Sequence, residues 1–421
     1  MPRVAVAGGG LAGLVAARRL AEAGVDVTLL EARSELGGRV RSARVGGFVI
    51  DRGFQVLFTA YPAARRELDL DALDLRRFDS GATIARPGSR SVLADPRRHP
   101  GLTIDALTSP EATLGDVLRL AALWRELRDV DPDALFDRGV ERSTAAELDA
   151  RGFSRRFVDA VVAPFVGGIT LDRSLSTDAG VFRYVFRMLA DGRAAVPADG
   201  MGAIPAQLAA RARDAGLDVR LDARVERVEP GTAGVTVTAA GEATEFDAAV
   251  VATDPPTAAE LTGVDAIPTA GRGCVTQYYG LPGHVELDTG RRLILNAGEA
   301  GPDHVAPLSA VAPEYAPADR TLLSATWIGE PDADDETLAA QAADALGAWF
   351  PERRFADLEH LETVRVPFAQ FDQSPGIRDQ LPDPDAPEGP VVLAGDYTQW
   401  SSIQGALASG RVAAERVGPY L

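Results

Sequence analysis

Residues 4–14 read VAVAGGGLAGL, and the architecture of the whole chain follows from them. The first four residues are an apolar run, which predicts a short buried strand of a parallel sheet. Gly8, Gly10 and Gly13 then fit the pattern G-x-G-x-x-G. Gly8 permits a tight turn, Gly10 lets the backbone approach a diphosphate, and Gly13 permits close packing of helix against strand. The helix that follows presents its first N–H groups to an anion, so the stretch predicts a dinucleotide site.

An acidic residue follows this turn at the distance expected for such a site. The helical stretch stops at Gly24, and residues 25–30, VDVTLL, predict a second strand that ends at Glu31. A carboxylate at that place accepts hydrogen bonds from the hydroxyls of an adenosine ribose and repels a 2′-phosphate. The order strand, turn, helix, strand and acid therefore predicts a Rossmann-type domain and disfavours NADP.

The next residues favour FAD over NAD. Residues 32–40 read ARSELGGRV, which places Gly37, Gly38 and Arg39 directly after the acid. This stretch resembles the signature of the flavin amine oxidase and phytoene desaturase superfamily. The resemblance implies FAD, with Arg39 in contact with its diphosphate. The single cysteine, Cys274, lies far along the chain from the flavin motifs, so non-covalent binding is expected.

A second flavin motif is expected near the carboxy terminus. Residues 391–396 read VVLAGD, an apolar strand that ends in Gly395 and Asp396, and the helix that follows has Ser401 or Ser402 as its N-cap. A helix N-terminus stabilises the negative charge of a reduced flavin, and Asp396 is placed to accept a hydrogen bond from a ribityl hydroxyl. Two separate flavin motifs in this order make FAD the predicted cofactor.

Two internal segments complete the expected cofactor site through the same resemblance. The segment DRGFQ at residues 51–55 corresponds to a D-x-G segment that passes beside the isoalloxazine, with a turn glycine and a core Phe as the alternative interpretation. Val225 matches a valine whose backbone contacts adenine. The residues expected to bind FAD are Gly8, Gly10, Leu11, Ala12, Gly13, Glu31, Ala32, Arg33, Gly37, Gly38, Arg39, Gly53, Phe54, Val225, Gly395, Asp396, Ser402, Ile403 and Ala406.

The expected fold class is α/β, or α+β overall. It combines a Rossmann-type FAD-binding domain with an inserted substrate domain of mixed helix and sheet. The chain passes through both domains more than once. The FAD-binding domain is expected to contain residues 1–67, 192–262 and 386–421, and the substrate domain residues 68–191 and 263–385.

The charge of the chain excludes one large class of function. Its 61 acidic residues against 43 basic ones give a net charge of −18, and every one of the basic residues is arginine. Nucleic-acid binding requires a basic surface, so no nucleic-acid partner is expected. Asp exceeds Glu by 38 to 23, which favours a halophilic protein adapted to a salty cytoplasm. A GC-rich genome is the alternative, although it explains the missing lysine better than the excess of Asp.

Neither a metal site nor a membrane span is predicted. The histidines at positions 99, 284, 304 and 360 have no ligand spacing, and one cysteine cannot build a cysteine-based zinc site. No apolar run is long enough for a transmembrane helix, and the first strand begins too close to Met1 for a signal peptide. A cytoplasmic protein is expected, with peripheral membrane contact as a route for an apolar substrate. The oligomeric state is left open.

Departures from the amine oxidases select a branch of the superfamily. Amine oxidases place a lysine near flavin N5, whereas this chain has none, and residues 400–406, WSSIQGA, lack the tyrosine that amine oxidases carry in the corresponding tract. Residues 368–376, FAQFDQSPG, are similar to a region of phytoene desaturases. The leading hypothesis is an FAD-dependent oxidoreductase that transfers hydride between flavin N5 and an apolar, isoprenoid or carotenoid-type substrate. An amine oxidase, a protoporphyrinogen oxidase-like enzyme, and a structural or sensing role for FAD are the alternatives.

The sequence assigns no catalytic residue. No histidine, cysteine or lysine stands out as a general base, which fits hydride transfer in a dry apolar cleft, where the cofactor supplies the chemistry and the protein positions the substrate. The side chains expected to line the substrate pocket are Phe54, Gln55, Tyr279, Trp327 and Gln370.

Overall fold

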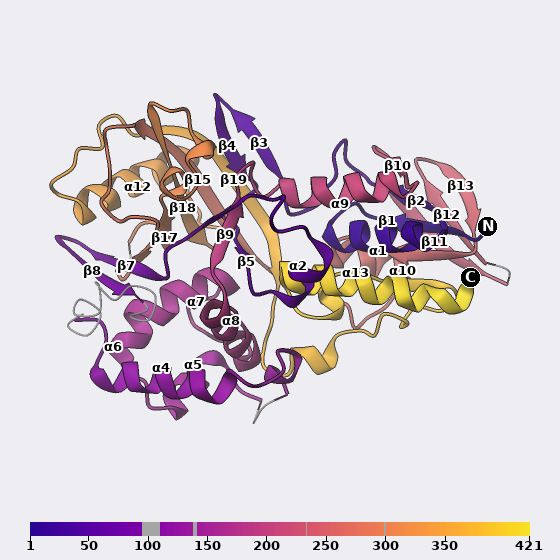
Figure 1. The fold of residues 1–421 in the computed structure, drawn as a ribbon, viewed down its shortest axis with the longest axis horizontal. Helices are drawn as coiled ribbons and strands as arrows, with labels where there is room; N and C mark the ends of the chain where they lie inside the picture. The colour runs from indigo at the N-terminus through magenta and orange to yellow at the C-terminus, as the bar shows by residue number, and fades with distance from the viewer. Residues whose placement is uncertain (95–109, 138–140, 233, 299) are drawn as a thin grey trace.

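The computed structural model describes residues 1–94, 110–137, 141–232, 234–298 and 300–421. Parts of the range expected for the substrate domain, and His99 with them, lie outside these residues. Figure 1 shows an elongated molecule with a parallel sheet and both chain termini at one end. A larger mixed sheet and a group of helices form the other end.

The first end contains a five-stranded parallel sheet. Side chains on its central strand alternate between two cores, with Val4 and Val6 on one face and Ala5 and Ala7 on the other. This alternation explains why the strand is apolar throughout, since both of its faces are covered. The strands stand in the order β10 (Asp218–Arg220), β2 (Asp26–Leu30), β1 (Arg3–Ala7), β14 (Ala248–Val251) and β20 (Val391–Leu393).

Helices cover one face of this sheet. Helix α1 (Leu11–Glu22) packs against both α9 (Ala203–Asp214) and α13 (Ile403–Val417). A Cβ atom at Gly410 would lie 2.3 Å from the carbonyl oxygen of Ala12, so α1 and α13 meet backbone to backbone. The other face packs against an antiparallel sheet and one helix: β11 (Val225–Gly231), β12 (Gly234–Ala239), β13 (Glu242–Phe246) and α10 (Pro255–Thr262).

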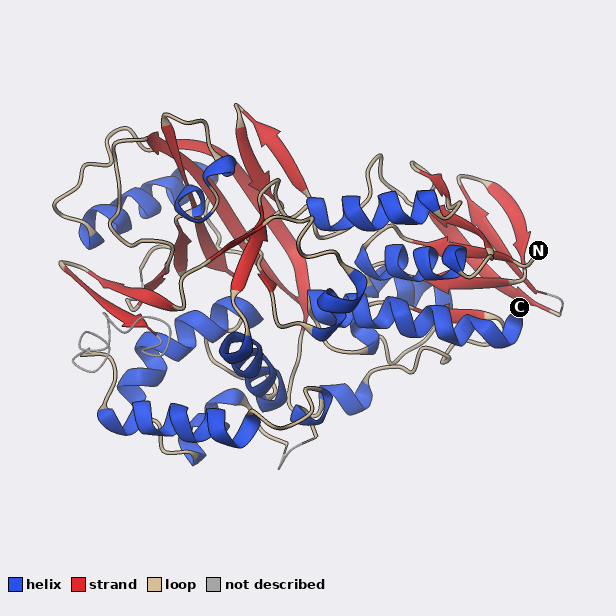
Figure 2. Cartoon of the chain, in the orientation of Figure 1, coloured by secondary structure: helices blue, strands red, loops and turns tan. Residues whose placement is uncertain are grey.

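The second end contains a seven-stranded sheet, drawn in red in Figure 2. Its neighbouring strands are antiparallel except for β16 and β7, which are parallel. Helix α12 (Asp335–Trp349) packs on one face. The strand order is β19 (Glu359–Phe371), β15 (Gly271–Pro282), β18 (Arg320–Ile328), β17 (His304–Ala306), β16 (Leu293–Asn296), β7 (Gly81–Arg86) and β8 (Ser89–Ala94).

A group of helices lies below this sheet in Figure 1. Its first helix begins at a capping box, in which Thr113 and Asp116 each bond the other's backbone N–H. No helix among the described residues is long and apolar enough to cross a bilayer. The group contains α4 (Leu114–Leu127), α5 (Thr144–Ala150), α6 (Arg155–Phe157), α7 (Ala163–Thr170) and α8 (Ala179–Asp191).

Short elements connect the two ends. They are β3 (Ser42–Val45), β4 (Phe48–Asp51), β5 (Leu57–Phe58), α2 (Pro62–Glu67), β6 (Leu75–Arg77), β9 (Ala194–Pro197) and α11 (Leu308–Val311). Both the doubly covered parallel sheet and the mixed helix and sheet region were expected. The predicted fold class is therefore confirmed.

Candidate functional site

The glycine turn between β1 and α1 can be built only with glycine at two of its positions. Gly8 has a φ of +108°, and a Cβ atom there would lie 2.6 Å from the carbonyl oxygen of Ala252. A Cβ atom at Gly13 would lie 2.0 Å from the carbonyl oxygen of Gly8. A Cβ atom at Gly10, in contrast, would meet nothing within 4 Å. The turn therefore holds open space in front of the N-terminus of α1, where Leu11 and Ala12 begin the helix, as an anion site requires.

Glu31 lies beside this open space, buried at the end of β2. Its Oε2 atom accepts a hydrogen bond of 2.7 Å from the Gly9 N–H, and its Oε1 atom accepts one of 2.9 Å from the Arg33 N–H. Each carboxylate oxygen has further lone pairs, so two ribose hydroxyls can still donate to it. The two backbone bonds fix the orientation of the carboxylate.

The loop after Glu31 folds back onto the glycine turn. The Gly37 N–H donates to the Gly9 carbonyl oxygen at 2.8 Å. Gly37 and Gly38 have φ angles of +117° and +59°, and a Cβ atom at Gly38 would lie 3.2 Å from the Cα atom of Gly10. Both residues thus take backbone conformations that glycine adopts freely. The two amino-terminal motifs, including Ala32 and Arg33 between them, form one continuous cradle.

An ion pair joins the amino-terminal and carboxy-terminal motifs. The Arg39 Nη2 atom lies 2.6 Å from the Asp396 Oδ1 atom, and Arg39 Nη1 donates to the Ala369 carbonyl oxygen at 2.9 Å. The other oxygen of Asp396 accepts from the Ser401 hydroxyl at 2.9 Å. A charge-assisted pair of this length fixes both side chains, so residues that are far apart in the sequence form one site.

Helix α13 begins beside Asp396 and Gly395. Its N-cap is Ser402, whose hydroxyl accepts from the Gly405 N–H at 2.8 Å. The half-buried side chains of Ile403 and Ala406 lie in its first turn. The first N–H groups of this helix provide the positive end of a helix dipole at the carboxy-terminal motif.

The segment DRGFQ runs between the two ends of the molecule. Gly53 has a φ of +81°, and a Cβ atom there would lie 3.7 Å from Val366 and 3.9 Å from the Thr276 hydroxyl. The Phe54 ring lies 6.1 Å from the Phe78 ring between centroids. Gln55 donates to the Arg39 carbonyl oxygen at 2.9 Å, which ties the segment to the cofactor cradle.

Asp51, at the start of the same segment, is buried between elements of both ends. Its carboxylate accepts hydrogen bonds from the Ser42 hydroxyl, the Met201 N–H at 2.9 Å and the Tyr315 hydroxyl at 3.1 Å. Burial raises the pKa of Asp51 to about 6, although the three hydrogen bonds act in the opposite direction. The Tyr278 hydroxyl donates to its backbone oxygen at 2.8 Å. Asp51 therefore couples the position of DRGFQ to the mixed sheet.

Two of the side chains expected in the substrate pocket lie on the face of the mixed sheet that α12 covers, here called the far face; the near face is the one that meets DRGFQ. Tyr279 and Trp327 belong to the core that includes Trp349 of α12. Thr276 and Tyr278 lie on the near face, where Phe54 N approaches the Thr276 hydroxyl at 3.4 Å and Tyr278 bonds Asp51. The structure therefore does not bring Tyr279 and Trp327 together with Phe54, because side chains alternate between faces along a strand.

The third distant candidate, Gln370, is held by other parts of the protein. Its amide donates to the Ile169 carbonyl oxygen at 2.6 Å, at the end of α7. Its carbonyl oxygen accepts from Gln373 at 3.4 Å, and Gln373 in turn accepts from the Ser401 N–H at 2.9 Å. Gln370 thus links the helical group to the start of α13.

Val225 follows a segment whose backbone is hydrogen-bonded to the backbone of Glu31 and Arg33. The Ala223 N–H donates to the Glu31 carbonyl oxygen at 2.8 Å, and the Asp222 N–H donates to the Arg33 carbonyl oxygen at 3.0 Å. Val225 begins β11 two residues later, with its side chain buried. The backbone at this point can therefore approach a base attached to the ribose.

The residues present fit a flavin dinucleotide. Open space at Gly10, a ribose acceptor at Glu31, the Arg39 guanidinium and the N-terminus of α13 supply a group for each part of FAD. In addition, the buried Gln55 Oε1 atom has no hydrogen-bond partner among the described residues. An unpartnered buried acceptor at this place indicates a donor from a bound ligand.

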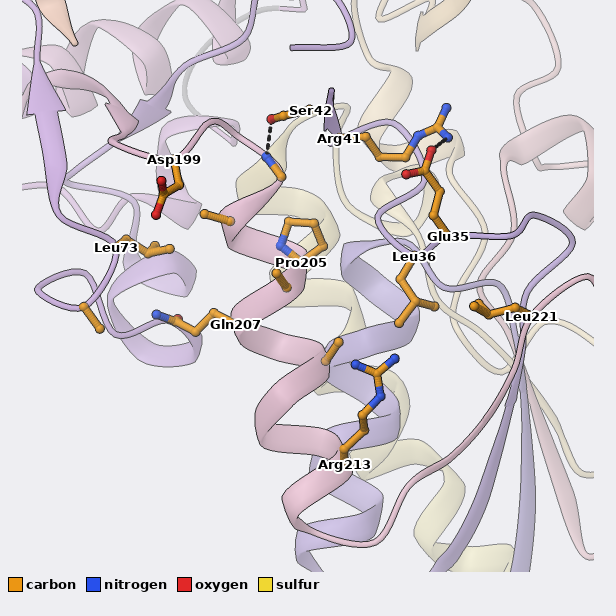
Figure 3. Close-up of a pocket in the computed structure, with 15 residues that line it drawn as sticks. Glu35, Leu36, Arg41, Ser42, Leu73, Asp199, Pro205, Gln207, Arg213 and Leu221 are labelled. Carbon is orange, nitrogen blue, oxygen red and sulfur yellow. Dashed lines mark hydrogen bonds and ion pairs between the residues drawn. The ribbon is translucent and has the colours of Figure 1, made fainter. Parts of the chain in front are cut away.

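An open groove lies beside this site and takes no part in it. Figure 3 shows that it runs along α9 and the loop that carries Leu36. The groove has a volume of about 740 Å³. The Leu36 side chain lies between the groove and Gly9, since a Cβ atom built at Gly9 would lie 2.5 Å from it. The groove therefore lies outside the loop that closes the cofactor cradle.

Sequence reasoning missed one polar row on the near face of the mixed sheet. Thr276, Thr326 and His304 stand opposite one another on β15, β18 and β17. All three are buried, and the His304 ring lies 5.2 Å from the Phe54 ring between centroids. Alternation along β15 could have paired Thr276 with Tyr278, but β17 is too short to show a period.

Comparisons with known proteins agree with this site. A family model described as flavin containing amine oxidoreductase matches residues 11–418. Protoporphyrinogen oxidase 2 of Arabidopsis thaliana is 31% identical over 39% of this chain and 32% of its own length. Hydroxyneurosporene desaturase of Cereibacter sphaeroides is 32% identical over 42% of this chain and 35% of its own length. The chain thus spans about a third of these curated relatives.

A solved structure shares the fold over the whole chain. An oxidoreductase from Methanosarcina mazei superposes with a TM-score of 0.76 and covers 98% of this chain and 100% of its own. Its sequence identity is 17%, so the likeness concerns the fold alone.

Proposed function

Because the chain belongs to the flavin containing amine oxidoreductase family, we propose that it transfers hydride between FAD and a carbon atom of an apolar, isoprenoid-type substrate. Family membership and an FAD-dependent oxidoreductase were both predicted from the sequence, and both are confirmed. The substrate class is the new element of the proposal. The cytoplasmic location and the halophilic character of the protein remain predictions from the sequence.

The side chains around Phe54 are the observation that favours an apolar substrate. Three groups in contact with this residue are the Phe78 ring, the His304 ring and the Thr276 hydroxyl, and Phe54 also packs against a hydrophobic cluster. None of these three bears a charge at neutral pH, since burial lowers the pKa of His304 to about 4. A wall of rings and neutral polar groups favours an apolar substrate over a polyamine, whose ammonium groups would lose hydration without a carboxylate partner.

Each part of the site has a task in this reaction. FAD, when bound, supplies the hydride acceptor at N5. The glycine turn, Glu31 and Arg39 hold the dinucleotide, and α13 places the positive end of its dipole near the carboxy-terminal motif. Phe54 and the near face of the mixed sheet hold the substrate and exclude water. The protein thereby contributes positioning and electrostatics.

A protoporphyrinogen oxidase-like activity is the second candidate. The Arabidopsis relative that bears this name is 31% identical, close to the 32% of the desaturase. A tetrapyrrole also offers an apolar ring system, but it carries carboxylates, which need cationic partners. The two candidate functions therefore differ in which substrate should reduce the flavin.

The test begins with the visible spectrum of the purified protein. Bound oxidised flavin should give absorption bands at about 375 and 450 nm. The FAD-loaded protein is then mixed anaerobically with neurosporene, hydroxyneurosporene, protoporphyrinogen and putrescine in separate experiments. Bleaching of the flavin by the carotenoids alone supports the proposal. Bleaching by protoporphyrinogen alone or putrescine alone contradicts it.

A further inference from the structure

His304 is a buried histidine whose side chain has no hydrogen-bond partner. Its side chain is 2% exposed, and neither Nδ1 nor Nε2 is bonded within the part of the chain that the structure describes. A neutral imidazole carries one N–H donor and one acceptor. Leaving both unbonded away from water costs free energy, so an unpartnered buried imidazole indicates a group that the protein alone does not supply.

The other members of the polar row are satisfied within the protein. The Thr276 and Thr326 hydroxyls bond to each other at 3.1 Å, and the Thr276 hydroxyl also lies 3.4 Å from Phe54 N. His304 stands next to Thr326 in the sheet register. The row therefore ends in one residue with free hydrogen-bonding capacity, on the face that Phe54 covers.

The space around the imidazole is bounded by small and aromatic groups. The Phe54 ring lies 5.2 Å from it between centroids. On helix α7, a Cβ atom at Gly168 would lie only 3.2 Å from Nδ1, so the missing side chain leaves this nitrogen uncrowded on the helix side. Phe54 and Gly168 are both half-buried, whereas the sheet behind His304 is fully buried.

The backbone of His304 is fixed by its neighbour. Asp303 pairs with Arg173 at 2.9 Å and accepts the Ile328 N–H at 2.7 Å. These contacts hold the start of β17 against β18. The burial of His304 outweighs the nearby Asp303 carboxylate, and the pKa of the imidazole falls to about 4. The ring is therefore neutral at physiological pH and stands in a fixed position.

We infer that His304 binds a hydroxyl group of an otherwise apolar substrate by a hydrogen bond at one ring nitrogen. This inference rests on the proposed function and names the polar group that its substrate carries. A hydroxyl can either donate to the acceptor nitrogen of a neutral imidazole or accept from its N–H, and it brings no charge into the buried site. A carboxylate or an ammonium group would each bring a charge into that site.

The test measures binding to the FAD-loaded protein by quenching of flavin fluorescence. The ligands are neurosporene and hydroxyneurosporene in detergent micelles. The variants are His304→Leu, which removes both ring nitrogens, and His304→Gln, which keeps a donor and an acceptor. His360→Leu, at an exposed histidine of β19, is the control.

Wild-type protein should bind hydroxyneurosporene about tenfold more tightly than neurosporene, which is the effect of one neutral hydrogen bond. His304→Leu should abolish this difference and leave neurosporene binding intact. His304→Gln should restore part of it, and His360→Leu should change neither dissociation constant.

Three results would overturn the inference. If wild-type protein does not distinguish the two carotenoids, or if His304→Leu keeps the difference, His304 does not bind the hydroxyl although the proposed function stands. If His304→Leu loses FAD or shifts the flavin spectrum, the residue contacts the cofactor instead. If neither carotenoid binds and putrescine or protoporphyrinogen bleaches the flavin, both the inference and the proposed function fail.

Discussion

The cofactor cradle and the substrate wall are built in different ways. In the cradle, the binding atoms belong mainly to the backbone, and their positions follow from glycines and helix ends, as at Gly8, Gly10 and the N-cap Ser402. The proposed substrate wall instead consists of side chains of Phe54, Thr276 and His304, which come from three separate parts of the chain. The cradle is encoded locally, whereas the wall is encoded by strand register.

This difference predicts how each region responds to mutation. A methyl group is enough to damage a cradle made of backbone, because the ligand approaches the chain to within van der Waals contact. A wall made of side chains tolerates changes on its far face and fails only where a near-face residue is altered. The predictions that follow test this contrast, beginning with the largest effect.

Gly10→Ala should weaken FAD binding by about 1,000-fold, or about 4 kcal/mol. A Cβ atom at this position meets no protein atom within 4 Å, so the chain should fold normally. The methyl group would instead occupy the space that the diphosphate requires. Titration of the apoprotein with FAD, followed by flavin fluorescence, measures the affinity, and circular dichroism checks the fold.

Gly347→Ala is the matched control in the other region. A Cβ atom there also meets nothing within 4 Å, and the residue is exposed on α12. FAD affinity should be unchanged, and the helix should gain slightly in stability. Equal FAD affinity for Gly10→Ala and Gly347→Ala would show that open space at Gly10 is not the diphosphate site.

Asp51→Asn should remove a pH-dependent loss of stability of about 3 kcal/mol, because the Asp51 carboxyl lies buried where cradle and wall meet. Burial raises the pKa of Asp51 from 3.8 to about 6. Between these values the folded protein binds a proton that the unfolded chain has released, so the free energy of unfolding falls as pH rises from about 4 to about 6. Above about pH 6 this part of the free energy of unfolding is lost, whereas the Asn variant, which has no carboxyl at this position, does not lose it.

Thermal unfolding at a series of pH values measures this effect. The melting temperature of the wild type should fall relative to that of Asp51→Asn between pH 4 and pH 7.5. The exposed Asp26→Asn is the control and should show no such dependence. A constant difference at all pH values would mean that the Asp51 carboxyl does not titrate in this window.

Glu31→Ala should weaken FAD binding by about 1.5–3 kcal/mol, the range for charge-assisted hydrogen bonds to a ligand. The variant also removes the acceptor for the Gly9 and Arg33 N–H groups. Glu35→Ala removes a solvent-exposed carboxylate on the same loop and should leave the affinity unchanged. If Glu31→Ala retains FAD as well as the wild type does, the Glu31 carboxylate does not bind the ribose.

The sequence was sufficient for the cradle because its signals are short and contiguous. The turn at Gly8, Gly10 and Gly13, the acid at Glu31 and the N-cap before α13 each follow from local backbone requirements. The ion pair between Arg39 and Asp396 was not predicted, because the two residues lie far apart in the sequence.

The sequence was insufficient for the wall because alternation shows two faces without telling which one meets the cofactor. On β15, residues 275 and 279 face α12, while residues 276 and 278 face DRGFQ. Only the packing of α12 decides between them. His304 lies on a strand of three residues, and its neighbours in the row come from strands with which it pairs only after folding.

Trp327→Phe should have the smallest effect on ligand binding and tests the far face directly. Trp327 is an aromatic residue of the mixed sheet, but it packs in the core that α12 covers, and its Nε1 atom has no partner among the described residues. The smaller ring should lower the free energy of unfolding by about 1–2 kcal/mol. Carotenoid binding should stay within about twofold of the wild type, since the change lies behind the sheet. A loss of binding as large as that of His304→Leu would place Trp327 in the substrate pocket, and the substrate wall would then include both faces of the sheet.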